Sequence, residues 1–189
     1  MYTVIERYEA LKEKVIERRV DFYNLIAFIE TETAWLTAPA STRFHLSQEQ
    51  GLLEHSCNVA ETMLNIKGSI APMIPDESCV IVALLHDLGK VGMPGNPQYT
   101  KGDKYPYSYN KDLTYLSVPI RSIYLALPYI ELTEEEVQAI VYHDGQYVDD
   151  NASVARNEEP LTLLLKYADT WSGFVLEKKI IQAVEVLSN

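Results

Sequence analysis

Apolar residues recur along this chain at intervals of three and four positions, which is the period of one face of an α-helix. Residues 3–18 show the pattern first, with charged residues between the apolar ones. It returns over residues 21–33, 52–67, 76–88, 118–127, 133–143 and 160–177, and a last helix is expected to reach Leu187. Strand signals are nearly absent. The pattern therefore predicts an all-α fold.

Three stretches interrupt the helical pattern. Residues 37–51 contain Pro39 and several small residues, and residues 146–159 are polar. The longest stretch, residues 92–114, holds three prolines and four tyrosines. A loop of this length in a compact domain is usually functional or disordered, and the aromatic content argues against disorder. We expect a substrate-facing loop or lid; the alternative is that its tyrosines pack onto the helices.

The bulk composition fits a protein that folds around one core. The chain has 189 residues, of which 47% are hydrophobic, and this length fits a single domain. No apolar run approaches the roughly 20 residues that cross a bilayer, and the charged N-terminus lacks the apolar stretch of a signal peptide. Cys57 and Cys79 lie in apolar helical contexts and are expected to be reduced thiols. These features predict a cytoplasmic protein with no membrane partner.

The charge distribution argues against long nucleic acids as partners and is compatible with a small phosphorylated molecule. The formal net charge of −11 argues against a general nucleic-acid binder, because neutralising the phosphate backbone needs Lys and Arg. Residues 88–121 are the exception, since five basic residues against two acidic ones give them a net charge of +3. The basic residues are Lys90, Lys101, Lys104, Lys111 and Arg121. A small phosphorylated substrate is therefore compatible with this chain, although the lysines could instead only keep a loop soluble.

Four residues can supply the ligands of one divalent cation: His55, the adjacent His86 and Asp87, and the distant Asp169. Mixed nitrogen and oxygen donors suit Mn²⁺, Fe²⁺, Co²⁺, Ni²⁺ or Zn²⁺, and Mg²⁺ is kept as a candidate. His86 and Asp87 are expected on one helix, about 100° apart around its axis. Apolar segments precede both aspartates, so one shared ion would remove the cost of burying two unpaired carboxylates. Taken singly, each residue also fits an ordinary core position; the ordered set points to a metal.

The order H…HD…D, with HDLGK after an apolar helix and Ala-Asp in a late helix, resembles the HD-domain superfamily of metal-dependent phosphohydrolases. The segment APASTRFHLSQEQGLLEHSCNV is similar to one in HD proteins related to bacterial 3′–5′ exoribonucleases and to stand-alone phage or clostridial HD domains. The similarity covers about residues 38–177. It implies a single compact HD-domain helical bundle over residues 38–189, with residues 1–37 as an N-terminal helical extension packed on it.

The resemblance also implies roles for individual residues. His55, His86, Asp87 and Asp169 match the four metal-ligand positions. Asp87 is also expected to orient or deprotonate the attacking water in the catalytic step. Lys90 matches a lysine that lies near the metal in relatives and can contact a phosphate oxygen.

Four further residues are expected to contact the substrate. His143 matches a later histidine, which is an extra ligand in two-metal relatives and contacts the phosphate in others. His45 matches the histidine before the first ligand and is expected to line the pocket. Arg121 is expected to help stabilise charge on the phosphoryl oxygens. Tyr105, with the other tyrosines of its loop, is expected to bind a nucleotide base.

Departures from the family pattern shape these expectations. Two-metal relatives carry another histidine near the start of the helix after the long loop, where this chain reads LSVPIRS (116–122), so we expect one ion. Gln50 replaces the first glycine of a glycine pair. HD-type 5′-deoxynucleotidases place a catalytic glutamate where this chain has Lys90, so their particular chemistry is not carried over.

The leading hypothesis is an enzyme, a phosphatase or phosphodiesterase that acts on a nucleotide or a similar small phosphate ester. One alternative is a single-strand 3′–5′ exonuclease, with nucleic-acid substrates limited to short single strands. Another is a non-catalytic HD module that binds a nucleotide or a protein partner and keeps its metal for stability. A purely structural helical protein would have no use for buried acids beside histidines. The amphipathic N-terminal helices also leave a homo-oligomer open.

Overall fold

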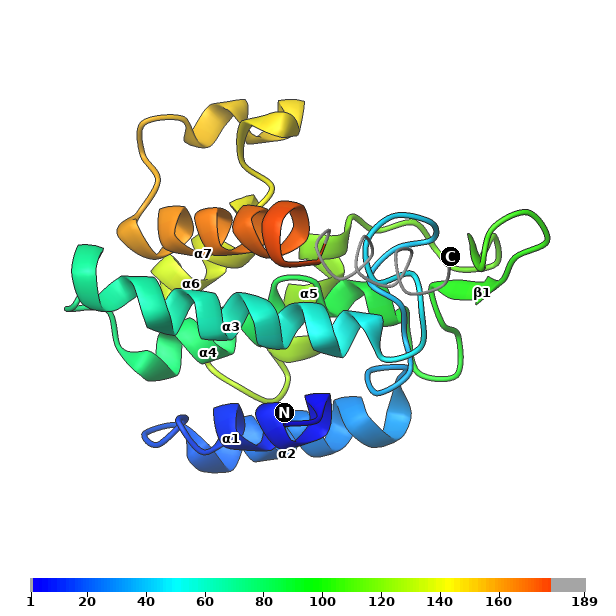
Figure 1. Cartoon of the computed structure of the whole chain (residues 1–189), viewed down its shortest axis with the longest axis horizontal. Coiled ribbons are helices and arrows are strands. Elements are labelled where there is room, and N and C mark those ends of the chain that lie inside the picture. The colour runs from blue at the N-terminus through cyan, green and yellow to red at the C-terminus, as the bar shows by residue number, and fades with distance from the viewer. Residues whose placement is uncertain (1, 178–189) are drawn as a thin grey trace, which may run out of the picture.

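Residues 2–177 are described by the computed structural model of the chain, and α-helices dominate them (Figure 1). In chain order these are α1 (Val4–Lys12), α2 (Arg19–Glu32), α3 (Gly51–Ile70), α4 (Asp76–Leu85), α5 (Val118–Ala126), α6 (Glu134–Tyr142) and α7 (Pro160–Trp171). Short 3₁₀ turns form at η1 (Leu88–Val91), η2 (Gly145–Tyr147) and η3 (Asp149–Val154), and a π-helical turn, η4 (Ser172–Leu176), continues α7. The all-α prediction is confirmed. The helix expected to end at Leu187 lies outside the described residues.

The long helix α3 runs through the middle of the bundle, with α1 and α2 along one side and α6 and α7 along the other (Figure 1). Helix α4 packs beside α3 and is apolar on every face, since all residues from Cys79 to Leu85 are fully buried. A helix of this kind needs partners all around it. Helices α3, α5, α6 and α7 all contact α4, so the core of the bundle is built around it.

Both cysteines belong to this core. Cys57 and Cys79 are buried and form no disulfide, as expected. Burial raises the pKa of the Cys57 thiol to about 12 and that of the Cys79 thiol to about 11, so both stay protonated and act as small apolar side chains. Within residues 2–177, no helix combines the length and the apolar character needed to cross a membrane.

Helix α1 is shorter than the sequence pattern predicts, because it ends at Lys12 rather than near residue 18. Glu77, in the first turn of α4, accepts hydrogen bonds from the backbone N–H groups of Ile16 and Glu17, both at 2.7 Å. These bonds hold the connection to α2 in a turn. A tertiary contact between residues about 60 positions apart thus overrides the local helical period.

The segment 92–114, expected to be irregular, contains a small antiparallel hairpin. Strand β1 (Tyr99–Lys101) pairs with β2 (Tyr107–Tyr109), and Tyr99 lies directly opposite Tyr109 with ring centroids 5.5 Å apart. Aromatic pairs across two strands stabilise such ribbons, and tyrosine favours extended backbone. Tyr99 is buried while Tyr109 is 64% exposed, so one tyrosine packs onto the body of the protein and its partner faces outward.

Helices α1 and α2 are part of the same packed unit as the rest of the described chain. Tyr8 and Phe22 belong to the hydrophobic cluster that also contains α3 and α4. Arg18, between the two helices, donates to both oxygens of the fully buried Glu136 carboxylate at 2.6 Å, and to Glu77 at 2.8 Å. Such a two-pronged ion pair fixes orientation as well as adding energy. The domain boundary at residue 37 stays a prediction.

Replacing Arg18 with methionine is expected to lower the free energy of unfolding by about 3–5 kcal/mol, because the buried Glu136 carboxylate loses its cation. Arg19→Met is the matched control, since Arg19 pairs with Glu13 at 2.9 Å on the exposed surface and such a pair contributes at most about 1 kcal/mol. Urea unfolding followed by circular dichroism measures both variants. Small and equal losses would contradict the role given to Arg18.

Candidate metal centre

Two histidines end their helices in the same way. His86 is the C-cap of α4, and His143 is the C-cap of α6. The Nδ1 atom of His86 lies 2.8 Å from the carbonyl oxygen of Ala83, and Nδ1 of His143 lies 2.8 Å from that of Ile140. A carbonyl can only accept, so Nδ1 carries a proton in both rings and satisfies a helix-end oxygen that would lack a partner. Nε2 is therefore the nitrogen that each ring presents to the space between the helices.

The turn that carries His86 and Asp87 is fixed by α5. The two residues do not share a regular helix as expected, because α4 ends just before His86, and Asp87 has φ −106° and ψ 7°. A Cβ on Gly89 would lie 2.2 Å from the carbonyl oxygen of Val118, so only glycine allows this approach of η1 to α5. Ser122 Oγ accepts from the Gly89 N–H at 2.8 Å and donates to the His86 carbonyl at 3.1 Å.

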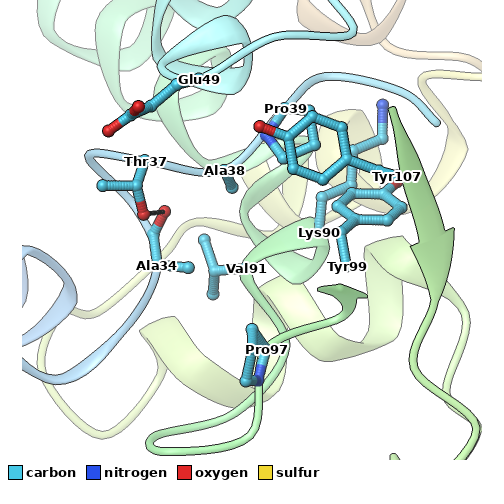
Figure 2. Close-up of a pocket in the computed structure, with 10 residues that line it drawn as sticks. All are labelled: Ala34, Thr37, Ala38, Pro39, Glu49, Lys90, Val91, Pro97, Tyr99 and Tyr107. Carbon is cyan, nitrogen blue, oxygen red and sulfur yellow. Dashed lines mark hydrogen bonds between the residues drawn. The ribbon is translucent and has the colours of Figure 1, made fainter. Parts of the chain in front are cut away.

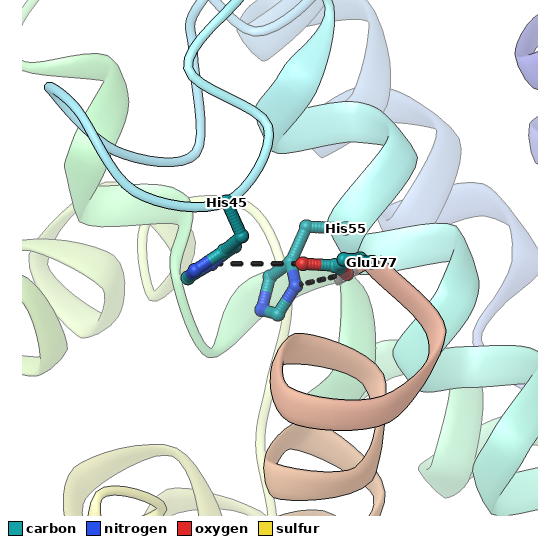
Figure 3. A group of neighbouring side chains, drawn as sticks. All are labelled: His45, His55 and Glu177. Atoms are coloured by element: carbon teal, nitrogen blue, oxygen red, sulfur yellow. Dashed lines mark hydrogen bonds and ion pairs between the residues drawn. The ribbon is translucent and has the colours of Figure 1, made fainter. Parts of the chain in front are cut away.

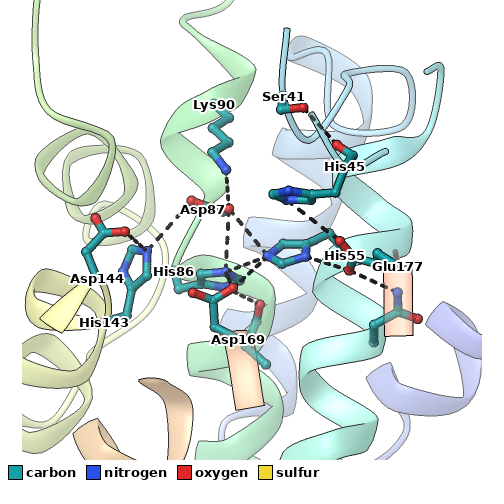
Figure 4. A network of polar contacts seen from close by, with 12 residues as sticks. Ser41, His45, His55, His86, Asp87, Lys90, His143, Asp144, Asp169 and Glu177 are labelled. Atoms are coloured by element: carbon teal, nitrogen blue, oxygen red, sulfur yellow. Dashed lines mark hydrogen bonds and ion pairs between the residues drawn. The ribbon is translucent and has the colours of Figure 1, made fainter. Parts of the chain in front are cut away.

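His55 reaches the same space from α3. Its Nδ1 atom lies 2.8 Å from Oε1 of Glu177, and its Nε2 atom lies 3.0 Å from Oδ1 of Asp169. Nε2 of His55 is also 3.4 Å from Nε2 of His86. Figure 4 shows these side chains converging from α3, from the end of α4 and from α7. The three imidazoles thus use Nδ1 for fixed hydrogen-bond partners and point Nε2 inward.

The donor atoms have the spacing of ligands around a single ion. Five of the six pairs among His55, His86, Asp87 and Asp169 measure 3.0 Å (His55–Asp169), 3.4 Å (His55–His86), 3.5 Å (His86–Asp87), 3.7 Å (His55–Asp87) and 4.0 Å (His86–Asp169). Metal bonds of about 2.1 Å place neighbouring donors about 3.0 to 3.4 Å apart, depending on coordination geometry. His86, Asp87 and His143 form a second group whose ligand atoms also lie close together. These buried groups can hold a divalent metal.

The cluster favours positive charge at its centre. Burial acts to lower the pKa of His55, but the carboxylates of Asp169 and Glu177 outweigh it and raise that pKa to about 10. Burial lowers the pKa of His86 to about 4, so its Nε2 atom has a free lone pair at neutral pH. A protonated His55 therefore holds the carboxylates together through a cationic charge. A divalent cation can supply that charge in place of the proton.

Asp87 lies between Lys90 and His143 (Figure 4). Nζ of Lys90 is 2.5 Å from Oδ2 of Asp87, and Nε2 of His143 is 3.8 Å from Oδ1. Burial acts to raise the pKa of the Asp87 carboxyl, but Lys90 and the neighbouring histidines hold it well below its usual range. The same balance, with His55 as the main partner, lowers the pKa of Asp169. Both groups are therefore ionised and can bind a cation.

Arg121 holds the hairpin segment in place rather than joining the cluster. Its side chain is almost completely buried. The guanidinium donates to Oε1 of Gln98 and to the carbonyl oxygen of Thr114, both at 2.6 Å. Gln98 precedes the hairpin and Thr114 follows it, so Arg121 ties both ends of this segment to α5. Its expected contact with phosphoryl oxygens stays a prediction.

The other two expected pocket residues lie in different places. Tyr105 is at the tip of the hairpin, where its hydroxyl accepts a hydrogen bond from Arg43 at 3.0 Å. That contact joins the hairpin to the loop before α3. His45, in the same loop, lies beside His55 with ring centroids 5.2 Å apart. The structure therefore brings His45 to the edge of the cluster, and the base contact expected of Tyr105 stays a prediction.

Glu177 lies at the site, although no sequence motif marks it. It follows the π-helical turn η4 and is fully buried, with its carboxylate against His55 and near His45 (Figure 3). A π-helical turn takes more residues than an α-helical one, and it changes the face on which later residues lie. An α-helical period counted from Asp169 therefore does not place Glu177. A single glutamate at the end of a predicted helix carries no other signal.

Two hollows open beside Lys90. The larger has a volume of about 760 Å³ and lies between the hairpin, the start of α5 and residues 141–151. Its lining includes Tyr99, Tyr109, Tyr115, Tyr142 and Asp144. The smaller, of about 260 Å³, lies between the loop before α3 and the hairpin, where Lys90, Tyr99 and Tyr107 line one side (Figure 2). Lys90 thus borders both hollows as well as the carboxylate of Asp87.

Comparison with known proteins gives one positive finding. The family model described as HD domain matches residues 52–172, a range that includes His55, His86, Asp87, His143 and Asp169. Neither the curated proteins nor the solved structures contain a significant match to this chain.

Asp87→Ala is expected to weaken Mn²⁺ binding by more than about 100-fold, because loss of an outer partner of a ligand already costs 10- to 100-fold. The free Mn²⁺ signal in electron paramagnetic resonance titrations measures the dissociation constant. Asp21→Ala, on the exposed side of α2, is the control and should bind as the wild type does. Wild-type affinity in Asp87→Ala would show that this carboxylate is not a ligand.

Proposed function

The chain belongs to the HD-domain family, and we propose that it is a phosphohydrolase that cleaves a phosphoester of a nucleotide or a similar small phosphorylated molecule. Members of this superfamily are generally metal-dependent hydrolases. The observation that carries the proposal is the convergence of three inward Nε2 atoms on the buried carboxylate of Asp87 and the partly buried carboxylate of Asp169, beside a lysine. A purely structural bundle has no need of such a group in its core, where each charge is costly.

In this proposal His55, His86, Asp87 and Asp169 hold one divalent ion. The charges of the clustered side chains support one ion rather than two. The three carboxylates of Asp87, Asp169 and Glu177, less the charge of Lys90, leave a deficit of two positive charges when the histidines are neutral. One divalent cation offsets that deficit, and a second would leave a buried excess of positive charge.

The ion, when bound, supplies Lewis acidity that activates water and neutralises charge on a phosphate. The protein's own groups do the rest. Asp87 holds its carboxylate where it can orient the water and accept its proton. Lys90 and His143 lie on opposite oxygens of Asp87. Lys90 can donate to an oxygen of a phosphoryl group placed beside that carboxylate. His143, whose Nδ1 proton is held by the Ile140 carbonyl, donates there through Nε2 only as an imidazolium.

The larger hollow supports a nucleotide as the substrate. Its volume of about 760 Å³ falls within the range of about 300–1,000 Å³ typical of small-molecule sites. Lys90 borders it, and its lining includes several tyrosines, among them the exposed Tyr115. A phosphate at Lys90 would place the rest of the molecule along these rings, and aromatic faces stack nucleobases. In this proposal Asp144, which lines the same hollow beside His143, accepts hydrogen bonds from sugar hydroxyls and repels a longer chain of phosphates.

Release of phosphate or nucleoside from nucleotides, cyclic dinucleotides and short oligonucleotides tests the proposal, with Mn²⁺, Co²⁺, Ni²⁺ or Mg²⁺ added in turn. Metal-dependent turnover of a mononucleotide or dinucleotide is expected, lost in Asp87→Ala and kept in Asp21→Ala. Cleavage of oligonucleotides alone would favour a single-strand exonuclease. No turnover in ion-loaded protein would contradict the hydrolase and favour a binding module.

Tyr115→Ala is expected to raise the KM for a nucleotide about tenfold, with a smaller effect on kcat, because stacking on an aromatic ring contributes about 1–3 kcal/mol per base. Tyr124→Ala is the control, since Tyr124 is also an exposed tyrosine, on α5, but does not line the larger hollow. Steady-state kinetics on the best substrate of the panel compares the two. Equal KM values in both variants would place the base elsewhere.

A further inference from the structure

The carboxylate of Glu177 is buried and makes specific hydrogen bonds to side chains of α3. Its side chain is completely buried, and Oε1 receives two hydrogen bonds, from Nδ1 of His55 at 2.8 Å and from Nδ2 of Asn58 at 3.1 Å. His55 and Asn58 are three residues apart on one face of α3. A carboxylate is not placed in an apolar interior without compensation. Here both contacts that compensate it come from the helix that carries the first proposed metal ligand.

The backbone around Glu177 is adapted to this position. The π-helical turn η4 immediately precedes it, and such turns are rare and occur frequently at functional sites. The turn packs against α3, where Thr62 Oγ1 lies 3.5 Å from Ser172 Oγ. Helix α7 thus presents Asp169 to one ring nitrogen of His55, and the end of η4 presents Glu177 to the other. The imidazole is held between two carboxylates from one continuous helical segment.

The second oxygen of Glu177 faces His45. Oε2 lies 3.7 Å from Nε2 of His45 (Figure 3). Both atoms are buried, and neither has a hydrogen-bond partner within residues 2–177. The carboxylate of Glu177 therefore lies between His55 on α3 and His45 in the loop that precedes α3. A small movement of that loop would bring the His45 imidazole into hydrogen-bond distance.

We propose that Glu177 is a positioning residue, which fixes the Nδ1-protonated form of His55 so that Nε2 faces the metal. This inference rests on the proposed metal site and adds a residue that acts through His55 rather than on the substrate. A carboxylate behind a histidine ligand fixes the orientation of the ring and makes its other nitrogen a stronger donor. Asn58 keeps the carboxylate in register with His55, and His45 extends the contact to the neighbouring loop.

Two variants of Glu177 and a matched control test the inference. Glu177→Ala removes the carboxylate, and Glu177→Gln keeps an acceptor oxygen while removing its charge. Glu54→Gln is the control, because Glu54 precedes His55 on α3 but bonds to Gln48 instead of a cluster residue. Two properties are measured in each folded protein: the Mn²⁺ dissociation constant and the visible absorption spectrum of the Co²⁺-loaded form. Thermal unfolding of the metal-free proteins shows which variants are folded.

The expected result is a 10- to 100-fold weaker Mn²⁺ affinity in Glu177→Ala, with a smaller loss in Glu177→Gln. The Co²⁺ bands should shift in both variants, whereas Glu54→Gln should match the wild type in both measurements. A role limited to stability would lower the unfolding temperature and leave the affinity and the bands unchanged, which would overturn the proposal. Equal losses in Glu54→Gln would overturn it as well. If Glu177→Ala does not fold, an unchanged dissociation constant in Glu177→Gln decides against it.

These outcomes are separate from those of the proposed function. A protein that binds Mn²⁺ through a Glu177-dependent site and hydrolyses no phosphoester would contradict the phosphohydrolase and leave the positioning role standing. A protein that hydrolyses a phosphoester while the Glu177 variants bind Mn²⁺ normally would support the phosphohydrolase and contradict the positioning role.

Discussion

The gathering of three carboxylates inside an apolar helical bundle, two of them buried and Asp169 partly buried, is the constraint on which the site depends. Asp87, Asp169 and Glu177 stay ionised although burial opposes their charge. An unpaired carboxylate in such surroundings would cost several kcal/mol. The surrounding groups are arranged to prevent this, since Lys90 pairs with Asp87 and His55 bridges the other two. The same arrangement can hold a metal, because the carboxylates outnumber the cationic side chains and favour a cation between them.

Helix ends do much of the work of orienting the imidazoles. An α-helix leaves its last carbonyl oxygens without partners, and both α4 and α6 satisfy one of them with Nδ1 of a C-cap histidine. The same bond that completes the helix selects which ring nitrogen faces the site. His86 and His143 therefore need no further carboxylate to set their orientation. His55 lies inside α3, where every backbone carbonyl nearby is used by the helix, and it takes Glu177 instead.

How much of this the sequence predicts depends on how local each feature is. The helical periods and the all-α fold follow from short-range patterns, and the predicted ligands His55, His86, Asp87 and Asp169 do come together, although their roles as ligands stay predictions. The early end of α1 depends on hydrogen bonds to a glutamate far along the chain, which no local period contains. The hairpin depends on cross-strand tyrosine contacts. In both cases a tertiary contact decides the local structure.

The contacts of two further residues depend on the fold in the same way. Arg121 stands in a basic segment next to the HD motif, and its charge alone suggests a phosphate contact. Only the fold shows that its guanidinium is occupied by Gln98 and by a backbone carbonyl. Glu177 is the opposite case, because no motif in the sequence marks it. One π-helical turn brings its carboxylate against His55. Residue type and spacing predict which chemistry is available, whereas side-chain partners depend on packing between distant elements.

A chain of hydrogen bonds finally connects the N-terminal helices to the site. Arg7 on α1 donates to Oδ1 of Asn58 at 2.7 Å, and Asn58 donates through Nδ2 to Glu177, which contacts His55. An amide between a guanidinium and a carboxylate has only one orientation that satisfies both, because its oxygen must accept and its nitrogen must donate. Arg7 therefore sets the direction of the Asn58 amide, and the amide sets the carboxylate behind the imidazole. Helix α1 acts in this way as part of the support of the site, although no residue of it enters the cluster.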